Sequence, residues 1–309
     1  MSALVRWFNH FSPTTRGVLL LCVSSSLFAT MGVCIRFASF TVDNTQVVFF
    51  RNLVTLVVIG GVYLGRAPKR FFSDMKTAQL KLHLVRGITG VAAMYGFFYA
   101  IAKLPLSNAM IFTYAAPVFI PFVAWVFLRE PMSARMWLAA GLGFVGVTLV
   151  AKPDTGVFDW ISLIGLSAAL LAATAFVAVR ALTKTEPITR IVFYFALIAS
   201  VISFVPALPG FRAFSLTELG FLLGAGAFAT AAQMVMSKAY SFADAGKIAP
   251  ANYTAIAIAG GWAWLIWGEV PDLISVLGML VILGAILLCM PDSVRTFKAW
   301  LVDKLSKQT

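Results

Sequence analysis

The chain has 309 residues, of which 61% are hydrophobic and 12% are charged, and its formal net charge is +12. Soluble domains average about 45–50% apolar and about 25% charged residues, so the composition excludes a soluble globular protein and predicts a polytopic membrane protein. The net positive charge does not indicate nucleic-acid binding, because the basic residues form short clusters between apolar runs, where they orient membrane helices.

A helix that crosses a bilayer needs about 20 mostly apolar residues, within a range of about 17–25. Ten segments approach this length, and we expect an all-α membrane protein with ten transmembrane helices. The N-terminal basic residues and the apolar run after them resemble a signal peptide, but the run lacks an A-x-A site and is interpreted as a retained first helix. The expected helices are 17–38, 46–64, 83–102, 108–128, 136–151, 160–180, 190–208, 218–239, 249–267 and 273–290.

The segment 104–150 has a second copy near the C-terminus. An offset of 139 residues places Glu130 on Glu269 and Tyr114 on Tyr253, and an offset of 144 places Arg36 on Arg180. Five helices per copy is an odd number, so the copies run in opposite directions across the membrane, as in many secondary transporters. We expect two inverted five-helix repeats at 17–151 and 160–290, between an N-terminal segment 1–16 and a basic tail 291–309.

The loop charges predict the orientation. If the N-terminus is cytoplasmic, 18 of the 24 basic residues fall in inner segments, whereas the outer loops hold Lys103, Lys152 and Arg212. This bias follows the positive-inside rule. We therefore expect an inner (plasma) membrane protein of bacterial type, with its N-terminus, C-terminus and basic tail in the cytoplasm. The other three basic residues, Arg36, Arg51 and Arg86, lie inside apolar segments.

Several short motifs carry a resemblance to a known family. They are the RxxxG of Arg86–Gly90, the FFYA of Phe97–Ala100, the LPLSNA of Leu104–Ala109 and the FLREP of Phe127–Pro131, which precedes a glycine-rich helix. With this helix order, residues 17–290 resemble the drug/metabolite transporter superfamily, and within it the EamA-type group. The resemblance implies a ten-helix carrier of small organic solutes, with a central cavity lined mainly by the first, third, fourth, sixth, eighth and ninth helices.

The arginines inside the apolar segments are candidate functional residues, because ionisable groups cost about 2.5–3.5 kcal/mol at a helix centre on insertion scales. Arg36 and Arg51 both lie near the expected outer face, where they either grip a substrate carboxylate or phosphate together or serve as structural anchors. Arg86 lies near the inner end of the third helix, where it guides an anion or binds a lipid phosphate; we favour the lipid.

Uncharged polar and aromatic residues are the other binding candidates. Tyr114 and Tyr253 occupy equivalent positions on the fourth and ninth helices, which the resemblance places at the cavity. Helix–helix hydrogen bonding is the alternative for the two amides Asn252 and Gln233. Packing is the alternative for the aromatic side chains of the third helix, and a membrane-interface belt is the alternative for the tryptophan. The remaining candidates are Asn252, Gln233, Tyr95, Tyr99, Phe98 and Trp264.

Four residues are candidate moving parts. Pro117 and Pro121 interrupt the expected fourth helix, and each removes a backbone N–H, which predicts either a hinge or a fixed kink. Glu130 and Glu269 lie in helix–helix turns, one on each side of the membrane. Each glutamate either caps its turn, pairs with Arg135 or a lipid-facing lysine, or holds a gate closed; we favour capping.

The function predicted from these features is secondary transport of a small polar or amphipathic metabolite, such as an amino acid or a nucleotide-like compound, by alternating access. The chain contains no GxxxxGK[ST] motif, so its energy comes from an ion gradient, from exchange or from the solute gradient itself. No Asp or Glu inside the expected membrane segments stands out as a proton carrier, so we expect facilitated transport or exchange rather than strict proton coupling, without a cofactor, in a monomer or homodimer. A drug-efflux carrier with an apolar cavity is the main alternative. A channel lacks its continuous polar lining, and an intramembrane enzyme lacks its nucleophile–base or metal set.

Overall fold

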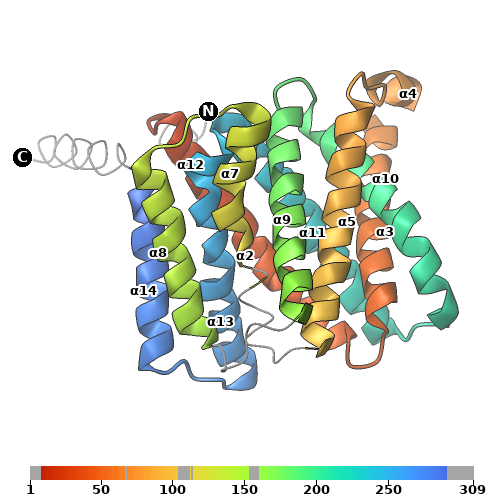
Figure 1. Ribbon diagram of the computed structural model, residues 1–309. Coiled ribbons are helices and arrows are strands. Elements are labelled where there is room, and N and C mark those ends of the chain that lie inside the picture. The colour runs from red at the N-terminus through yellow and green to blue at the C-terminus, as the bar shows by residue number, and fades with distance from the viewer. Residues whose placement is uncertain (1–7, 67, 104–111, 113, 153–159, 291–309) are drawn as a thin grey trace, which may run out of the picture.

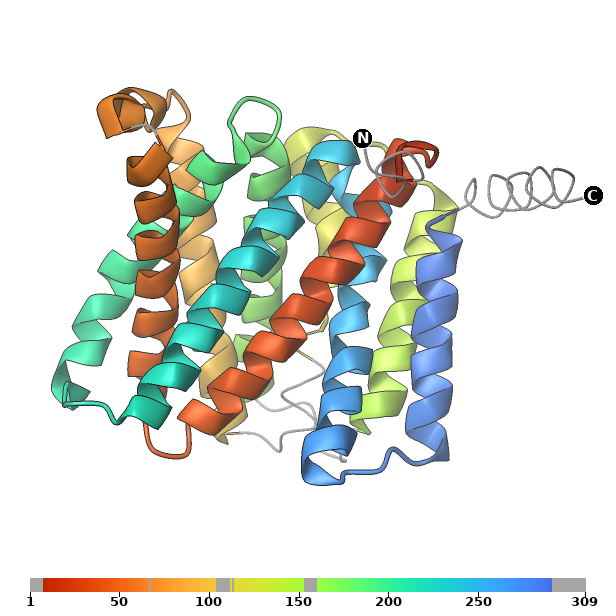
Figure 2. The same ribbon diagram turned by 180° about the vertical axis from the view of Figure 1, so that it is seen from behind.

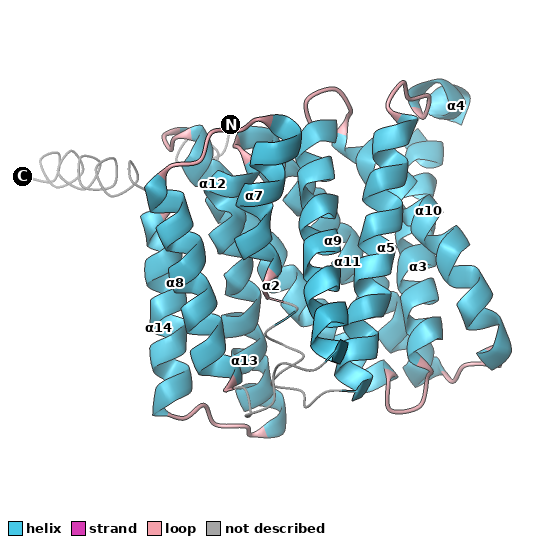
Figure 3. Ribbon diagram, viewed as in Figure 1, coloured by secondary structure: helices cyan, strands magenta, loops and turns pink. Residues whose placement is uncertain are grey.

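A computed structural model describes residues 8–66, 68–103, 112, 114–152 and 160–290. Within these ranges every regular element is a helix, and Figure 3 shows no strand among them. The long helices lie side by side and roughly parallel to one axis (Figure 1). The expected all-α class is therefore confirmed.

The described part of each half supplies five long segments. The first half contains α2 (Pro13–Ala38), α3 (Asn44–Arg66), α5 (Leu80–Lys103), α7 (Ala116–Leu128) and α8 (Ala134–Ala151), with η1 (Pro68–Arg70) and α4 (Phe71–Asp74) between α3 and α5. The second half contains α9 (Trp160–Leu182), α10 (Ile188–Ala207), η2 (Leu208–Gly210), α11 (Leu216–Phe242), α12 (Ala245–Ile248), η3 (Ala249–Tyr253), α13 (Thr254–Trp267) and α14 (Leu273–Leu288).

Six of the described helices, α2, α3, α8, α9, α10 and α11, are long and apolar enough to cross a membrane. Two others, α7 and α14, are apolar but shorter. Together with α5 and the α12–α13 segment, they match the ten expected spans in order. Their ends differ by a few residues; α2, for example, begins at Pro13, where the Ser12 hydroxyl accepts the Thr15 N–H at 3.3 Å.

The packing of the helices follows the inverted repeat. Helix α2 packs against α11 and α13, and its repeat mate α9 packs against α5 and α7, which are the mates of α11 and α13. Equivalent helices also pack against each other, α3 with α10 and α8 with α14. Figures 1 and 2 show α8 and α14 side by side at one edge of the molecule. The two inverted five-helix repeats are thus present in three dimensions.

Two glycines of α8 allow close contacts with neighbouring elements. A Cβ atom on Gly146 would lie 2.8 Å from the Gly278 carbonyl oxygen of α14, and one on Gly143 would lie 2.2 Å from the Tyr253 ring. Gly141 faces open space instead. Small residues let membrane helices approach until their backbones touch, and α8 therefore serves as scaffold for both α14 and η3.

Two expectations about helix continuity are wrong. Pro117 does not interrupt a helix interior, because it lies in the first turn of α7, where its missing N–H has no helical partner to lose. Pro121 alone lies inside the described helix. The ninth span is not continuous either, since the short helix α12 and the 3₁₀ turn η3 precede α13. Residues 108–111 and 113 of the expected fourth helix lie outside the described residues.

The two ends of the helix bundle carry different turns. We call the terminal face the end at which α2 begins at Pro13 and α14 ends at Leu288; it also carries α12 and the α7–α8 turn (Figure 1). The opposite face carries the α13–α14 turn and the end of α2 at Ala38 (Figure 2).

Candidate functional site

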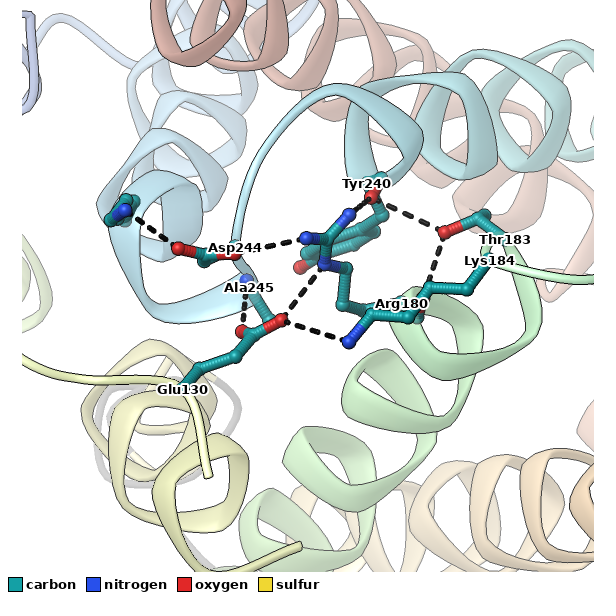
Figure 4. A network of polar contacts seen from close by, with 8 residues as sticks. Glu130, Arg180, Thr183, Lys184, Tyr240, Asp244 and Ala245 are labelled. Atoms are coloured by element: carbon teal, nitrogen blue, oxygen red, sulfur yellow. Dashed lines mark hydrogen bonds and ion pairs between the residues drawn. The ribbon is translucent and has the colours of Figure 1, made fainter. Parts of the chain in front are cut away.

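A largely buried polar network lies at the terminal face around Arg180. The Arg180 guanidinium donates to Glu130 and to Asp244 at 2.9 Å each, and to the Tyr240 carbonyl oxygen at 2.9 Å (Figure 4). The second Glu130 oxygen accepts the backbone N–H of Ala245 at 2.9 Å. The side chains of Arg180 and Glu130 are 14% and 6% exposed. The network therefore joins α9, the α7–α8 turn and the α11–α12 junction in a largely dry setting.

Asp244 adds a second carboxylate to this network. Burial alone would raise the pKa of Asp244, but the hydrogen bond and charge of Lys247, together with Arg180, outweigh burial and hold the pKa below its ordinary value. A carboxyl group with a lowered pKa stabilises the folded state above the ordinary value, and this contribution is lost as the pH falls through the lowered pKa. The carboxylate therefore remains charged, and the network intact, at neutral pH.

The opposite face carries a related but more open ion pair. Arg36, at the end of α2, donates to Glu269 in the α13–α14 turn at 3.0 Å, and its guanidinium stacks over Trp267 at 3.9 Å. Both side chains are about half exposed, at 47% and 54%. Nearby, a hydrogen bond from Lys152 lowers the pKa of Asp272 to about 2. The opposite face is thus held by exposed pairs, which contribute little stability.

The two Arg–Glu pairs are equivalent under the inverted repeat. Arg36 corresponds to Arg180 and Glu130 to Glu269, and in each pair the arginine comes from one half and the glutamate from the other. The expected pairing of Glu130 with Arg135 is wrong, because Arg135 donates to the Leu288 carbonyl oxygen instead. Turn capping is also wrong for Glu130, since its carboxylate binds Arg180 and the N–H of Ala245, outside its own turn.

A third polar group lies inside the bundle, away from both faces. Arg86 of α5 is 3% exposed and donates to the Gln233 amide oxygen of α11 at 3.0 Å. Arg51 of α3 is 7% exposed, and its Nη1 atom contacts the Met94 sulfur at 3.4 Å. The expected lipid-phosphate role of Arg86 is wrong, because a side chain so deeply buried does not reach a headgroup. Arg51 and Arg36 share no partner among the described contacts.

The candidate residues of the ninth span are held by intraprotein contacts. The Tyr253 side chain is fully buried and donates to the Ala140 carbonyl oxygen of α8 at 3.1 Å. The Asn252 amide donates to the Ala249 carbonyl oxygen at 2.9 Å and lies 3.5 Å from the Tyr240 hydroxyl. The structure thus gives both side chains a packing role.

The remaining aromatic candidates are dispersed. Tyr114 is partly buried against the main core cluster, and Tyr95 packs on Val91 and Phe195 with its hydroxyl buried and unpartnered. Tyr99 and Trp264 are 39% and 54% exposed, and the structure does not bring them to the buried arginines. Phe98 lies in α5, but its side chain falls outside the described residues.

Two residues of these clusters were missed or set aside by sequence reasoning. Asp244 lies in a loop and has no acidic repeat mate, so its sequence offers no signal. Arg86 did offer a signal, because it is an unpaired charge inside an apolar segment. A contact with a lipid headgroup explains such a charge equally well. In the part of the chain that the structure describes, no group of three or more His, Cys, Asp or Glu side chains is arranged to hold a metal ion.

Comparison with known proteins decides the family. The EamA-like transporter family matches residues 15–152 and again residues 159–290, one match for each half. The chain belongs to the EamA-like transporter family. Its relatives are transporters rather than enzymes, so this EamA chain is an integral membrane transporter of small molecules.

The relatives differ in what they carry. The pseudopaline exporter of Pseudomonas aeruginosa is 30% identical over 284 residues, covering 87% of this chain and 94% of the relative. The S-adenosylmethionine uptake transporter of Rickettsia bellii is 27% identical, with 87% and 90% covered, and the riboflavin transporter of Vibrio cholerae is 26% identical, with 83% and 86% covered. A solved structure that is 16% identical matches with a TM-score of 0.74 over 91% of this chain and 98% of its own, which supports the fold alone.

The Tyr253 hydroxyl gives a first testable prediction. Tyr253→Phe removes one buried hydrogen bond to α8, and we expect a loss of about 0.5–1.5 kcal/mol in the free energy of unfolding with unchanged apparent affinity for substrate. Thermal unfolding of the purified protein and transport kinetics measure the two quantities. A large rise in apparent KM without loss of stability would instead place the hydroxyl in the binding site.

Proposed function

We propose that this transporter is a secondary carrier that moves a small polar or amphipathic organic metabolite across the inner membrane by alternating access. The observation that supports this proposal is the crosswise pairing of Arg180 with Glu130 and of Arg36 with Glu269, one pair at each face. Inverted repeats generate alternating access when the two halves exchange conformations around a central site. Pairs between the halves are well placed to hold each face closed in turn.

The unequal burial of the two pairs supports a specific conformational state. The terminal-face pair is buried and has further partners, whereas the opposite-face pair is half exposed. We propose that the terminal face is closed and the opposite face is ready to open. With the termini in the cytoplasm, as the loop charges predict, this is the state that precedes opening to the outside.

We also propose the class of compound that this protein transports. The relatives carry pseudopaline, S-adenosylmethionine and riboflavin, which supports an organic metabolite such as an amino acid or a nucleotide-like compound for this chain. One of these relatives is an exporter and another an uptake transporter, so family membership does not set the direction of transport. Energy would come from exchange or from the solute gradient, without strict coupling to protons.

Counterflow in proteoliposomes tests this function. Vesicles containing the purified protein are loaded with one unlabelled compound and diluted into its labelled form; the compounds are S-adenosylmethionine, riboflavin and the twenty common amino acids. A carrier exchanges label inward before the internal pool leaves, so we expect transient accumulation of at least one compound, with saturable kinetics. Linear, non-saturating flux without transient accumulation, or no flux for the whole panel, would contradict the proposal.

A further inference from the structure

The interior group around Arg86 and Arg51 is not used by the ion pairs that close the two faces. Arg86 lies on the face of α5 that carries Gly90, where a Cβ would lie only 2.6 Å from its Nη1 atom. The guanidinium also stacks on the Phe195 ring of α10 at 4.0 Å. The position of the Arg86 guanidinium is therefore fixed by the α5 backbone at Gly90, by the Phe195 ring and by the Gln233 amide oxygen.

Arg51 approaches the same helix about one turn further along. Its Nη1 contacts the sulfur of Met94, which is four residues after Gly90 on α5. Four residues of an α-helix span about 6 Å along its axis, so the two guanidinium groups lie at neighbouring levels of α5. Two positive charges at neighbouring levels of one helix repel each other unless an anion lies between them. A carboxylate between the two guanidinium groups would fit this spacing, with one oxygen accepting from each arginine.

The two charges lack a counter-ion among the described residues. Arg36, Arg180, Arg190 and Arg212 each pair with a carboxylate, whereas the described partners of Arg86 and Arg51 are an amide oxygen, a ring and a sulfur. The Nε atoms of both Arg51 and Arg86 are buried without a hydrogen-bond partner, as is the Tyr95 hydroxyl. Burying unpaired charges and donors is costly, and buried charges in proteins are normally paired. The arrangement is that of an anion site whose anion comes from outside the protein.

The surroundings favour a carboxylate over a phosphate. Two arginine forks satisfy the two oxygens of a carboxylate, while a phosphate presents more oxygens that need donors. Apart from Gln233 and the Tyr95 hydroxyl, the neighbours described above are apolar: Met94, Val91 and Phe195. These side chains suit the organic remainder of a solute.

We propose that Arg51, Arg86 and Gln233 form a substrate subsite that binds the carboxylate group of the transported solute. Gln233 orients the Arg86 guanidinium through its amide oxygen, and the Nε–H groups of both arginines donate to the carboxylate. That the carboxylate belongs to a transported solute rests on the proposed function. The binding of an anion to these residues does not rest on the proposed function, and binding and transport are tested separately.

The test uses a small probe and the purified full chain in detergent. Melting temperatures are measured against increasing sodium propionate, propionamide (its neutral isostere) and sodium phosphate, at an ionic strength held constant with sodium methanesulfonate. We expect propionate to raise the Tm of the unmodified chain by several degrees and saturably, because a ligand bound only to the folded state stabilises it by mass action. Propionamide is expected to have no such effect.

Variants assign the effect to the proposed residues. Arg86→Met and Arg51→Met are each expected to raise the half-saturating propionate concentration about tenfold or more, since each removes a charge-assisted hydrogen bond. Arg86→Lys, which keeps the charge but loses the fork, is expected to fall between Arg86→Met and the unmodified chain and guards against misfolding of the methionine variant. Arg70→Met is the matched control, because it removes an exposed arginine of η1 and is expected to leave the propionate response unchanged.

Three results would overturn the subsite. They are equal shifts with propionate and propionamide, full retention of the propionate shift in both methionine variants, and half-saturation by phosphate at a lower concentration than by propionate. Each of these concerns binding alone. A propionate response that depends on Arg86, in a protein that fails the counterflow test, would uphold the anion site and reject the transport function.

Discussion

Glu130→Gln is expected to open the terminal face. The substitution removes the carboxylate that accepts from Arg180 and from the Ala245 N–H, and leaves a largely buried guanidinium with Asp244 as its remaining charged partner. Removing one partner of a buried ion pair costs about 3–5 kcal/mol, and we expect about 3 kcal/mol because Asp244 remains. At about 1.4 kcal/mol per factor of ten, the closed state would lose about 100-fold in relative population.

Cysteine accessibility measures this change. Ser237 lies one turn beyond Gln233 on the same face of α11 and is fully buried. In a background without the three natural cysteines, we expect the maleimide labelling rate of Ser237→Cys, applied from the terminal face, to rise about 100-fold with Glu130→Gln. An unchanged rate would show that the network does not hold this face closed.

Glu269→Gln is the matched control for that experiment. It removes the equivalent carboxylate from the exposed pair at the opposite face, and exposed pairs contribute about 0–1 kcal/mol. We expect it to change the labelling rate of Ser237→Cys by less than about fivefold. Equal effects of the two glutamine variants would contradict the assignment of a closed terminal face and a looser opposite face.

Gly146→Val is expected to disrupt the contact between α8 and α14. A Cβ at Gly146 would lie 2.8 Å from the Gly278 carbonyl oxygen and 2.8 Å from Cγ1 of Ile282, and the carbonyl belongs to the facing backbone, which cannot rotate away. Overpacking of this kind costs about 1–3 kcal/mol, and valine adds two methyl groups to the clash. We expect a lowered Tm and a smaller monodisperse fraction on size-exclusion chromatography.

Gly141→Val in the same helix is the control for this prediction. A Cβ at Gly141 meets no atom within 4 Å, so a side chain there begins in open space. We expect its Tm to stay close to that of the unmodified chain. If both variants lose stability equally, the cause is the change of residue type in α8 and not the approach of the two helices.

Much of the fold was predictable from the sequence, because a transmembrane helix requires a long apolar run that is visible without knowledge of its neighbours. The correspondence of Glu130 with Glu269 and of Arg36 with Arg180 was also visible as a constant spacing. The spacing shows which residues are equivalent but not which residues touch. The partner of Glu130 is 50 positions away in α9, while the nearer Arg135 points to a different helix.

The interior site was harder to predict for a similar reason. Gln233 and Arg51 stood out as polar residues in apolar helices, but 147 positions separate Gln233 from its partner Arg86. Arg86 near a helix end is equally compatible with a lipid headgroup until its burial is known. The break before α13 was missed although Pro250 and Asn252 lie in η3, because the run from Ala249 to Trp267 is long enough to be taken for one continuous span.

Paired distance measurements test most directly whether the two inter-repeat ion pairs separate in alternation. Spin labels are placed at exposed positions beside each pair: Ser133 and Thr185 at the terminal face, and Phe40 and Val270 at the opposite face. Double electron–electron resonance in lipid nanodiscs then gives one distance distribution per face, after replacement of Cys22, Cys34 and Cys289.

We expect Glu130→Gln to lengthen the Ser133–Thr185 distance and to shorten the Phe40–Val270 distance in the same preparation, because opening one face of an alternating carrier closes the other. Distances that lengthen at both faces together, or that change at neither face, would contradict the account.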